Sequence, residues 1–324
     1  MDAIGSDEHG RAVIDQSRCV SCGQCLVSCP FGAIADKGQI YQLIQSILKG
    51  DQVIAIVAPA FIGQFGKHST PEKFVTAMKI LGFDRVVEVA VGADMWTIEE
   101  AEDFLEKGPN EQPFMATSCC PAWHSMVHKL FPAQSKNISM TLTPMVFTAR
   151  LMKKEFPGCK VVFVGPCAAK KLEAIRADIR SDVDFVLTFE ELRGMFEAKE
   201  VDFASLEGSE TLNEGTAAGR GFAVSGGVAQ AVTDVIHKTH PDLEVNTARA
   251  EGLRECRKLM TLAKAGKYNG YLLEGMACPG GCVAGAGTLL PVDLAAKVVG
   301  RYQAEADRES PLESDYKDIG HKLD

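Results

Sequence analysis

Short apolar runs alternate with segments of helical periodicity along most of the chain. Residues 53–59 (VIAIVAP) and 160–165 (KVVFVG) are nearly continuous apolar runs, which are typical of strands buried on both faces of a sheet. Strands that alternate with helices predict an α/β fold with mostly parallel sheets. The predicted strands cover residues 53–59, 85–92, 113–117, 160–165, 184–188, 246–250 and 268–276. The predicted helices cover residues 71–82, 93–107, 121–131, 143–156, 189–199, 225–238, 253–265 and 292–305.

The same pattern divides the chain into three parts. Residues 1–40 are expected to form a small cysteine-bearing segment that begins with a loose polar leader. Residues 41–305 carry the alternating strands and helices and are expected to form the main domain, with lobes at about 41–157 and 158–305. Residues 306–324 are polar and without periodicity, so we expect a frayed polar tail.

Composition and charge narrow the class of protein. Hydrophobic residues make up 46% of the 324 and charged residues 24%, as in globular proteins. The longest apolar run, residues 53–63, contains Pro59 and is far shorter than the ~20 residues of a membrane-spanning helix. The N-terminus shows no signal-peptide pattern, so a cytoplasmic protein without a membrane span is expected. The net charge of −9 argues against nucleic acid as a partner.

Eleven cysteines are the most unusual feature of the composition. In a reducing cytoplasm, clustered cysteines indicate metal binding or catalysis rather than disulfides. Cys159 and Cys256 stand alone and are expected to be buried apolar residues. The other nine lie in groups whose spacing is typical of metal sites.

The first group has the spacing C-x2-C-x2-C-x3-C-P, which is the bacterial ferredoxin run. It predicts a [4Fe-4S] cluster; zinc is the competing metal, but zinc sites usually come as separated pairs of ligands. In two-cluster ferredoxins the cysteine before the proline binds the other cluster, and here there is a single run. The fourth residue therefore either closes this cluster or leaves that place to a remote group. The candidate ligands are Cys19, Cys22, Cys25 and Cys29.

A second constellation is spread over three segments, each following a predicted strand. They are residues 117–123 (TSCCPAW), 165–173 (GPCAAKKLE) and 274–285 (EGMACPGGCVAG). Sites of open α/β sheets form beyond the carboxyl ends of strands, so these segments can converge on one point. Their thiolates suffice for a second cube, with Cys119 left as a spare thiol. The four candidate ligands are Cys120, Cys167, Cys278 and Cys282.

These segments resemble the three signature motifs of the [FeFe]-hydrogenases, TSCCPxW, MPCxxKxxE and ExMxCxGGCxxG. Two match at every fixed position, and the middle one has Gly165 in place of Met. The resemblance implies two mixed or parallel-sheet lobes clasping an H-cluster, with a small ferredoxin-like Fe–S segment docked nearby. The H-cluster would be a [4Fe-4S] cube on the four cysteines, joined through Cys282 to a diiron unit with CO, cyanide and a bridging azadithiolate.

The resemblance also implies roles for residues around the diiron unit. Lys170 would donate a hydrogen bond to one cyanide, and Pro59 and Ala60 would lie beside the other. Met276 and Phe222 would line the pocket, although ordinary core packing also accounts for a methionine there. At Gly165 a side chain over the diiron unit would be missing, which leaves redox tuning and oxygen response open.

A proton relay is implied by the same resemblance. It would run from Cys119 through a water to Glu100, then to Ser139 and to an outer acid at Asp103. Glu100 and Asp103 lie three residues apart and so share one helix face. The competing interpretations are a solvated acidic helix face for Glu100 and a turn or cap hydroxyl for Ser139. His124 and His128 are expected to be surface or stacking residues.

The expected function is therefore reversible H2 formation, 2 H⁺ + 2 e⁻ ⇌ H2, with electrons entering through the N-terminal cluster. Ferredoxin or another redox chain would exchange electrons with it, H2 and protons would be the substrates, and maturation proteins would supply the diiron unit. Two alternatives stay open. One is a sensory hydrogenase of low activity, and the other is a non-catalytic Fe–S cluster-assembly protein without the diiron unit.

Overall fold

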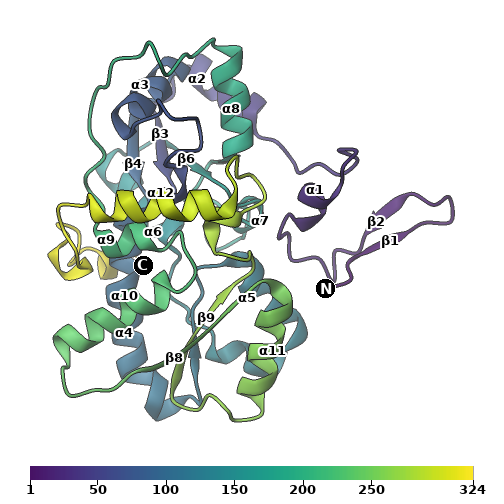
Figure 1. The fold of residues 1–324 in the computed structure, drawn as a ribbon, viewed down its shortest axis with the longest axis vertical. Coiled ribbons are helices and arrows are strands. Elements are labelled where there is room, and N and C mark those ends of the chain that lie inside the picture. Colours follow the sequence, from purple (N-terminus) through teal and green to yellow (C-terminus); the bar gives the residue numbers. More distant parts are fainter. Residues whose placement is uncertain (324) are drawn as a thin grey trace.

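Two parallel sheets form the body of the protein (Figure 1), in a computed structural model that describes residues 1–323. The four-stranded sheet has the order β4-β3-β6-β7 and the three-stranded sheet the order β5-β9-β8, while β1 and β2 form a separate antiparallel hairpin. The strands are β1 Ile4–Ser6, β2 Ala12–Ile14, β3 Val53–Val57, β4 Arg85–Glu88, β5 Met115–Ala116, β6 Lys160–Gly165, β7 Phe185–Thr188, β8 Asn246–Glu251 and β9 Tyr271–Met276.

Helices cover the faces of both sheets, as crossover connections between parallel strands require. In Figure 1, α3 and α8 lie beside the four-stranded sheet, α11 lies beside the three-stranded sheet, and α12 crosses between the two. The helices are α1 Gln24–Ser28, α2 Ile40–Leu48, α3 Pro71–Leu81, α4 Ala90–Glu111, α5 Pro121–Leu130, α6 Pro144–Glu155, α7 Ala169–Glu173, α8 Phe189–Ala198, α9 Ala217–Gly221, α10 Gly227–Thr239, α11 Leu253–Lys264 and α12 Val292–Ala304.

The four-stranded sheet is buried on both faces because its strands alternate between two apolar clusters. Ile54, Ile56 and Phe163 point into one cluster, whereas Val53 and Val57 point into the other. All strand pairs in the two large sheets are parallel, with Ile56 opposite Phe163 where β3 meets β6. The predicted α/β fold with parallel sheets is therefore confirmed.

The lobes do not follow the expected division of the chain at residue 157. β3 and β4 precede that point and pair with β6 and β7, which follow it. Likewise, β5 precedes it and pairs with β9. Each sheet thus takes strands from both halves of the main domain, because hydrogen bonding between parallel strands joins segments that are distant in sequence.

The boundary between β4 and α4 differs from the prediction. The strand expected over 85–92 ends at Glu88, and the helix expected over 93–107 runs instead from Ala90 to Glu111. A short apolar run does not distinguish a buried strand from the first turn of a buried helix. Gly92 lies in the first turn of α4, at the point where this helix packs closely on α6. A Cβ at Gly92 would overlap the Pro144 carbonyl oxygen, so only glycine fits there.

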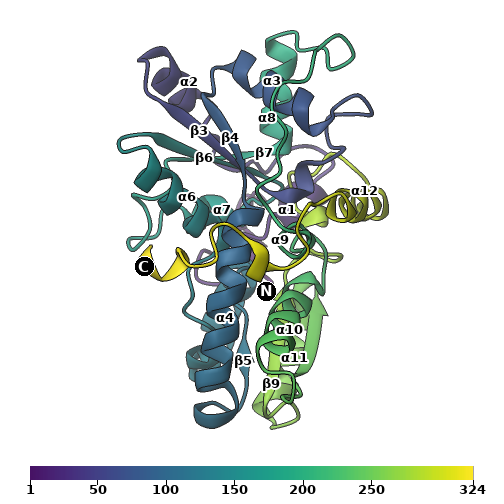
Figure 2. The same cartoon turned by 90° about the vertical axis from the view of Figure 1, so that its left-hand side faces the viewer.

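Both ends of the chain are more ordered than expected. The leader forms the β1–β2 hairpin, and the prediction of a frayed tail is wrong. Residues 306–323 cross α4 (Figure 2) and contact it at Pro311–Glu313 and Gly320–Lys322. The Arg150 guanidinium donates a 2.6 Å hydrogen bond to the Leu323 carbonyl. The few apolar side chains of this polar segment account for its packing, since Leu312, Tyr316 and Ile319 contact the core.

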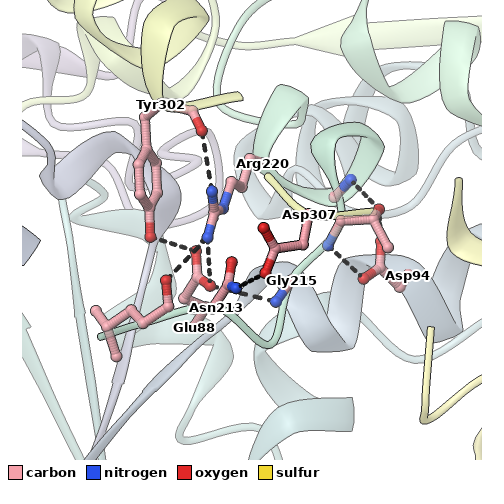
Figure 3. A network of polar contacts seen from close by, with 10 residues as sticks. Glu88, Asp94, Asn213, Gly215, Arg220, Tyr302 and Asp307 are labelled. Atoms are coloured by element: carbon pink, nitrogen blue, oxygen red, sulfur yellow. Dashed lines mark hydrogen bonds and ion pairs between the residues drawn. The ribbon is translucent and has the colours of Figure 1, made fainter. Parts of the chain in front are cut away.

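A buried ion pair joins β4, α9 and α12 (Figure 3). The Arg220 guanidinium, 1% exposed, donates hydrogen bonds of 2.9 and 3.1 Å to the carboxylate of Glu88, which is fully buried. The Tyr302 hydroxyl donates to the same carboxylate at 2.6 Å, and its ring lies 3.8 Å below the guanidinium carbon. Gly215 donates its amide to Glu88 as well. This network holds the chain between residues 212 and 220 against the end of β4.

No helix within residues 1–323 combines the length and the apolar character needed to cross a membrane.

We expect Glu88→Gln to lower the free energy of unfolding by roughly 3–5 kcal/mol, because it leaves the buried Arg220 cation without its opposing charge. Glu197→Gln is the matched control: Glu197 pairs with Arg193 on the exposed surface, where a pair is worth below about 1 kcal/mol. Anaerobic urea denaturation of both variants tests this. Equal shifts of the two midpoints would contradict a special role for the buried pair.

Candidate functional site

One cavity, the main cavity, lies where the carboxyl ends of the two sheets meet. It holds about 820 Å³ of space, with open solvent at its mouth included, and most of its lining is apolar. Segments that follow β3, β4, β5, β6 and β9 contribute to its wall. All five cysteines of the second constellation line it, namely Cys119, Cys120, Cys167, Cys278 and Cys282. The convergence predicted from their positions after strands is confirmed, with the strands coming from two sheets.

Turns at the strand ends hold these cysteines in the cavity wall. Cys120 directly precedes α5, and its sulfur accepts a hydrogen bond of 3.5 Å from the amide of Ala277. Gly281, with φ at 93°, allows the turn before Cys282. A Cβ on Gly281 would lie 2.6 Å from the amide nitrogen of Ser225, so the backbone comes too close for any other residue.

The electrostatics of the thiols fit a cube of iron and sulfide. Burial, reinforced by the neighbouring thiols, raises the pKa of Cys167 to about 11 and that of Cys282 to about 12. Several thiolates are therefore disfavoured here unless positive charge lies among them, which iron ions supply. Within residues 1–323, no three His, Cys, Asp or Glu side chains are placed to hold a single ion. Four thiolates around a larger cluster suit this donor set.

Lys170 brings a fixed positive charge to the same cavity. Its ammonium nitrogen lies 2.6 Å from Glu173 and 3.2 Å from the Thr143 hydroxyl, and that hydroxyl donates to Glu173 at 2.6 Å. Burial lowers the pKa of Lys170, but the Glu173 carboxylate outweighs it and the net pKa is raised. Lys170 is therefore a buried cation held in one place by two partners.

Glu100 is fully buried and belongs to a chain of hydroxyl groups. The Ser139 hydroxyl donates a 2.5 Å hydrogen bond to one carboxyl oxygen of Glu100 and lies 3.0 Å from the Thr141 hydroxyl. Burial raises the pKa of Glu100 from its ordinary value of 4.5 to about 8. Asp103, one turn further along α4, is paired with Lys107 at 2.9 Å and is partly exposed. The interpretation of Glu100 as a solvated acid is wrong, because α4 turns this face inward.

The four residues expected beside the diiron unit all line the main cavity: Pro59, Ala60, Met276 and Phe222. The ring of Phe222 meets Trp96 edge-on, with centroids 5.4 Å apart. Met276 and Phe222 also belong to the apolar core, so core packing and cavity lining are compatible.

The N-terminal cysteines lie close to the main cavity. Cys19 and Cys25 line a second cavity together with Lys171, and the charge of Cys22 contributes to the raised pKa of Cys278. Cys29 does not line this second cavity. Its sulfur accepts a 3.3 Å hydrogen bond from the backbone amide of Ala33. Burial raises the pKa of Cys22, and Cys25 and Cys19 add to this. Three of the four candidate ligands therefore lie close together, with Cys29 outside the second cavity.

Contacts tie this segment to the cysteine-bearing turns. Gly23 packs so closely that a Cβ there would lie 2.4 Å from the Cβ of Ala286 and 3.2 Å from that of Ala168. Lys171 forms ion pairs of 2.6 Å with Asp36 and 2.8 Å with Glu191, which join the segment to α8.

Sequence reasoning missed several contributors to the site. Thr143 and Thr141 support Lys170 and Ser139 from a loop without any pattern, and Met145 and Phe163 line the cavity from elements that read as ordinary core. Glu173 was detectable, because it occupies the last fixed position of the middle motif. The expectation of a surface residue is confirmed for His128, which is exposed; its ring lies against that of half-buried His124, tilted by 36° with centroids 4.3 Å apart.

Two family models match the chain. The model of the C-terminal domain of the iron-only hydrogenase large subunit matches residues 51–286, and the model of a 4Fe-4S binding domain matches residues 12–35. The first covers most of the chain and includes every residue that lines the main cavity. The second includes all four cysteines of the N-terminal group.

Known relatives include both hydrogenases and Fe-S cluster assembly factors. The chain is 30% identical to iron hydrogenase 1 of Clostridium pasteurianum, over 87% of this chain and 65% of that protein. It is 27% identical to a probable cytosolic Fe-S cluster assembly factor of Aedes aegypti, over 70% of this chain and 58% of that protein. The chain thus spans less than two thirds of the length of either relative.

A solved structure shows the same fold. The apo [FeFe]-hydrogenase of Chlamydomonas reinhardtii superposes with a TM-score of 0.72 at 22% identity, over 87% of this chain and 95% of that chain.

We expect Glu100 to stay protonated at neutral pH. The infrared spectrum should contain a protonated-carboxyl band that fades as the pH rises through about 8, and Glu100→Gln should lack it. Between about 4.5 and 8 the folded chain holds a proton that the unfolded chain has released, so this residue's contribution to the free energy of unfolding falls as pH rises.

Glu106→Gln, an exposed position on the same helix, is the control and should keep the band. An unchanged spectrum in Glu100→Gln would show that Glu100 is ionised.

Proposed function

The chain belongs to the iron-only hydrogenase family, and on that basis we propose that it catalyses 2 H⁺ + 2 e⁻ ⇌ H2 at the main cavity. The observation that carries the proposal is the meeting of five cysteines and one buried lysine in a single, mostly apolar cavity. Turning over H2 requires protons and electrons to reach a site from which bulk water is excluded. In this proposal protons and electrons reach the site through different parts of the chain.

The chain would hold an H-cluster through four of these cysteines. Cys120, Cys167 and Cys278 would bind the [4Fe-4S] cube, and Cys282 would bind both the cube and a diiron unit with CO, cyanide and azadithiolate. When bound, this group supplies the redox-active metal and the base for splitting H2. Pro59, Ala60, Met276 and Phe222 would enclose it and keep water away, since they line the cavity with apolar surface.

Lys170 would orient the bound group from one side. Its ammonium is an anchored donor and a positive charge, and both features suit an anionic ligand such as cyanide. Glu173 and Thr143 act as positioning residues, because they hold the ammonium nitrogen within 2.6 and 3.2 Å.

Protons would travel along Cys119, Glu100, Ser139 and Asp103. Burial raises the pKa of the Cys119 thiol well above its ordinary value, so this thiol carries a proton at the cavity wall. Glu100 has a pKa near the working pH, as an efficient proton carrier needs. One of its carboxyl oxygens accepts the Ser139 hydrogen bond, and the other is buried; a water would have to link Glu100 to Cys119. Asp103 is the partly exposed end of this route.

Electrons would enter through a [4Fe-4S] cluster on the N-terminal cysteines. The close packing of Gly23 on Ala168 and Ala286 supports this route, because a cluster held by the N-terminal cysteines would lie near the turns that carry Cys167 and Cys282. The electron donor or acceptor would be ferredoxin or another redox chain, and maturation proteins would insert the diiron unit.

The alternative is a cluster-assembly protein that keeps the cubes without the diiron unit. Cys119 and Lys170 favour the enzyme, because a bare cube needs neither a spare thiol nor a buried cation beside it. Infrared absorption after anaerobic maturation separates the two functions. Bands of metal-bound CO and cyanide, together with H2 turnover, support a hydrogenase, whereas full cubes without such bands indicate the assembly function. Bands with very slow turnover would point to a sensor of H2.

We expect Cys119→Ser to keep its iron and its infrared bands while H2 turnover falls by roughly 10²- to 10⁴-fold, the range for loss of an acid–base group. Cys159→Ser is the control, since Cys159 is buried away from the main cavity. Unchanged turnover in Cys119→Ser would refute the relay.

We expect Gly23→Ala to lower H2 evolution driven by reduced ferredoxin several-fold while the infrared bands stay intact. The added methyl would overlap Ala286 and push the N-terminal cluster away. Gly10→Ala is a matched control: Gly10 has nearly the same φ, 76° against 78°, with nothing within 4 Å of an added Cβ. If H2 evolution falls equally in Gly23→Ala and Gly10→Ala, backbone strain is responsible and not a displaced N-terminal cluster.

A further inference from the structure

Phe163 is part of the main cavity, although no motif marks it. It lies in β6 with 3% of its surface exposed, two residues before the end of the strand. Its position opposite Ile56 directs the ring to the sheet face that carries Ile54, Ile56 and Ala58. The ring lines the main cavity, as do Pro59 and Cys167 from the segments after β3 and β6.

Gly165 leaves room for this ring. Residues 163 and 165 project from the same face of β6, because side chains alternate along a strand. A Cβ at Gly165 would lie 2.6 Å from two carbons of the Phe163 ring and 3.1 Å from the Cβ of Ala58. The backbone does not require glycine here, since Gly165 is not among the residues with positive φ. The absent side chain is therefore explained by space and not by conformation.

We propose that Phe163 limits the size of the main cavity at the end of the four-stranded sheet and so controls which small apolar molecules enter it. Gly165 is the partner that this role requires, because the ring occupies the space of any side chain there. A side chain at 165 would overlap the ring and force it to move. The size of the cavity does not depend on the proposed function; only the identity of the entering molecules, H2 and other small gases, rests on it.

Xenon tests the cavity without the diiron unit. Crystals of Phe163→Ala that carry only the cubes should take up a xenon atom beside Ala58 at several-fold higher occupancy than the unchanged chain, because enlarged apolar cavities bind xenon. Phe74→Ala is the matched control, because Phe74 is fully buried in the other apolar cluster. A xenon atom in Phe74→Ala should therefore lie in that cluster and not beside Ala58. Unchanged occupancy beside Ala58 in Phe163→Ala would overturn the proposal. Should Phe163→Ala fail to fold, Phe163→Leu makes the same test.

A double variant tests the pairing of the two residues. Gly165→Met alone should lower the melting temperature of the cube-only protein and reduce the diiron unit retained per cube, measured by infrared. Adding Phe163→Ala should restore both, since it frees the space for the methionine. A Gly165→Met protein as stable and as fully loaded as the parent would overturn the pairing.

The failure of this proposal and that of the proposed function are distinguishable. If CO and cyanide bands are absent from every variant including the parent, the hydrogenase function fails, while xenon occupancy and melting temperature still decide the role of Phe163. If the bands are present, external CO should bind faster in Phe163→Ala than in the parent. Equal rates of CO binding in Phe163→Ala and the parent would overturn the proposal that Phe163 controls entry to the cavity.

Discussion

The crowding of thiols at the junction of the two sheets is the constraint on which the rest of the structure depends. Burial raises the pKa of the Cys167 and Cys282 thiols, and the neighbouring thiols raise it further. Such a site is stable with ionised ligands only around a positively charged inorganic core. The chain itself fixes parts of this cavity wall. Gly281 allows the close backbone approach before Cys282, and the Glu88–Arg220–Tyr302 network holds residues next to Val89, Gly219 and Phe222, which line the cavity.

The cysteines were predictable from the sequence because metal ligands are chemically scarce and act at fixed spacings. The positions of Cys120, Cys167 and Cys278 after predicted strands were enough to place them in one cavity. The burial of Glu100 was a different problem: its acidic neighbours suggest a solvent face, and only the packing of α4 decides the matter. The family resemblance implied a Glu100 inside the protein, whereas the local composition suggested an exposed Glu100.

Other features depend on tertiary contacts that leave little trace in the chain. The start of α4 could not be separated from the end of β4, because buried strands and buried helices share apolar composition. The tail beyond residue 306 packs through three scattered apolar side chains, too few to form a period. Thr143 and Phe163 were missed since a hydroxyl in a loop and a phenylalanine in a strand are common everywhere. The lobe boundary was misplaced because strand pairing, and not sequence order, determines which segments share a sheet.

The interleaving of the sheets bears on how such a molecule can be made. Since β5 completes a sheet whose other strands lie more than a hundred residues later, neither half of the chain contains a whole lobe. A ribosome that has delivered only the first half leaves two incomplete sheets with open edges, which are prone to wrong pairing. The main cavity can therefore be complete only after nearly the full polypeptide has been released, because its wall runs from Ala58 to Gly285 along the chain.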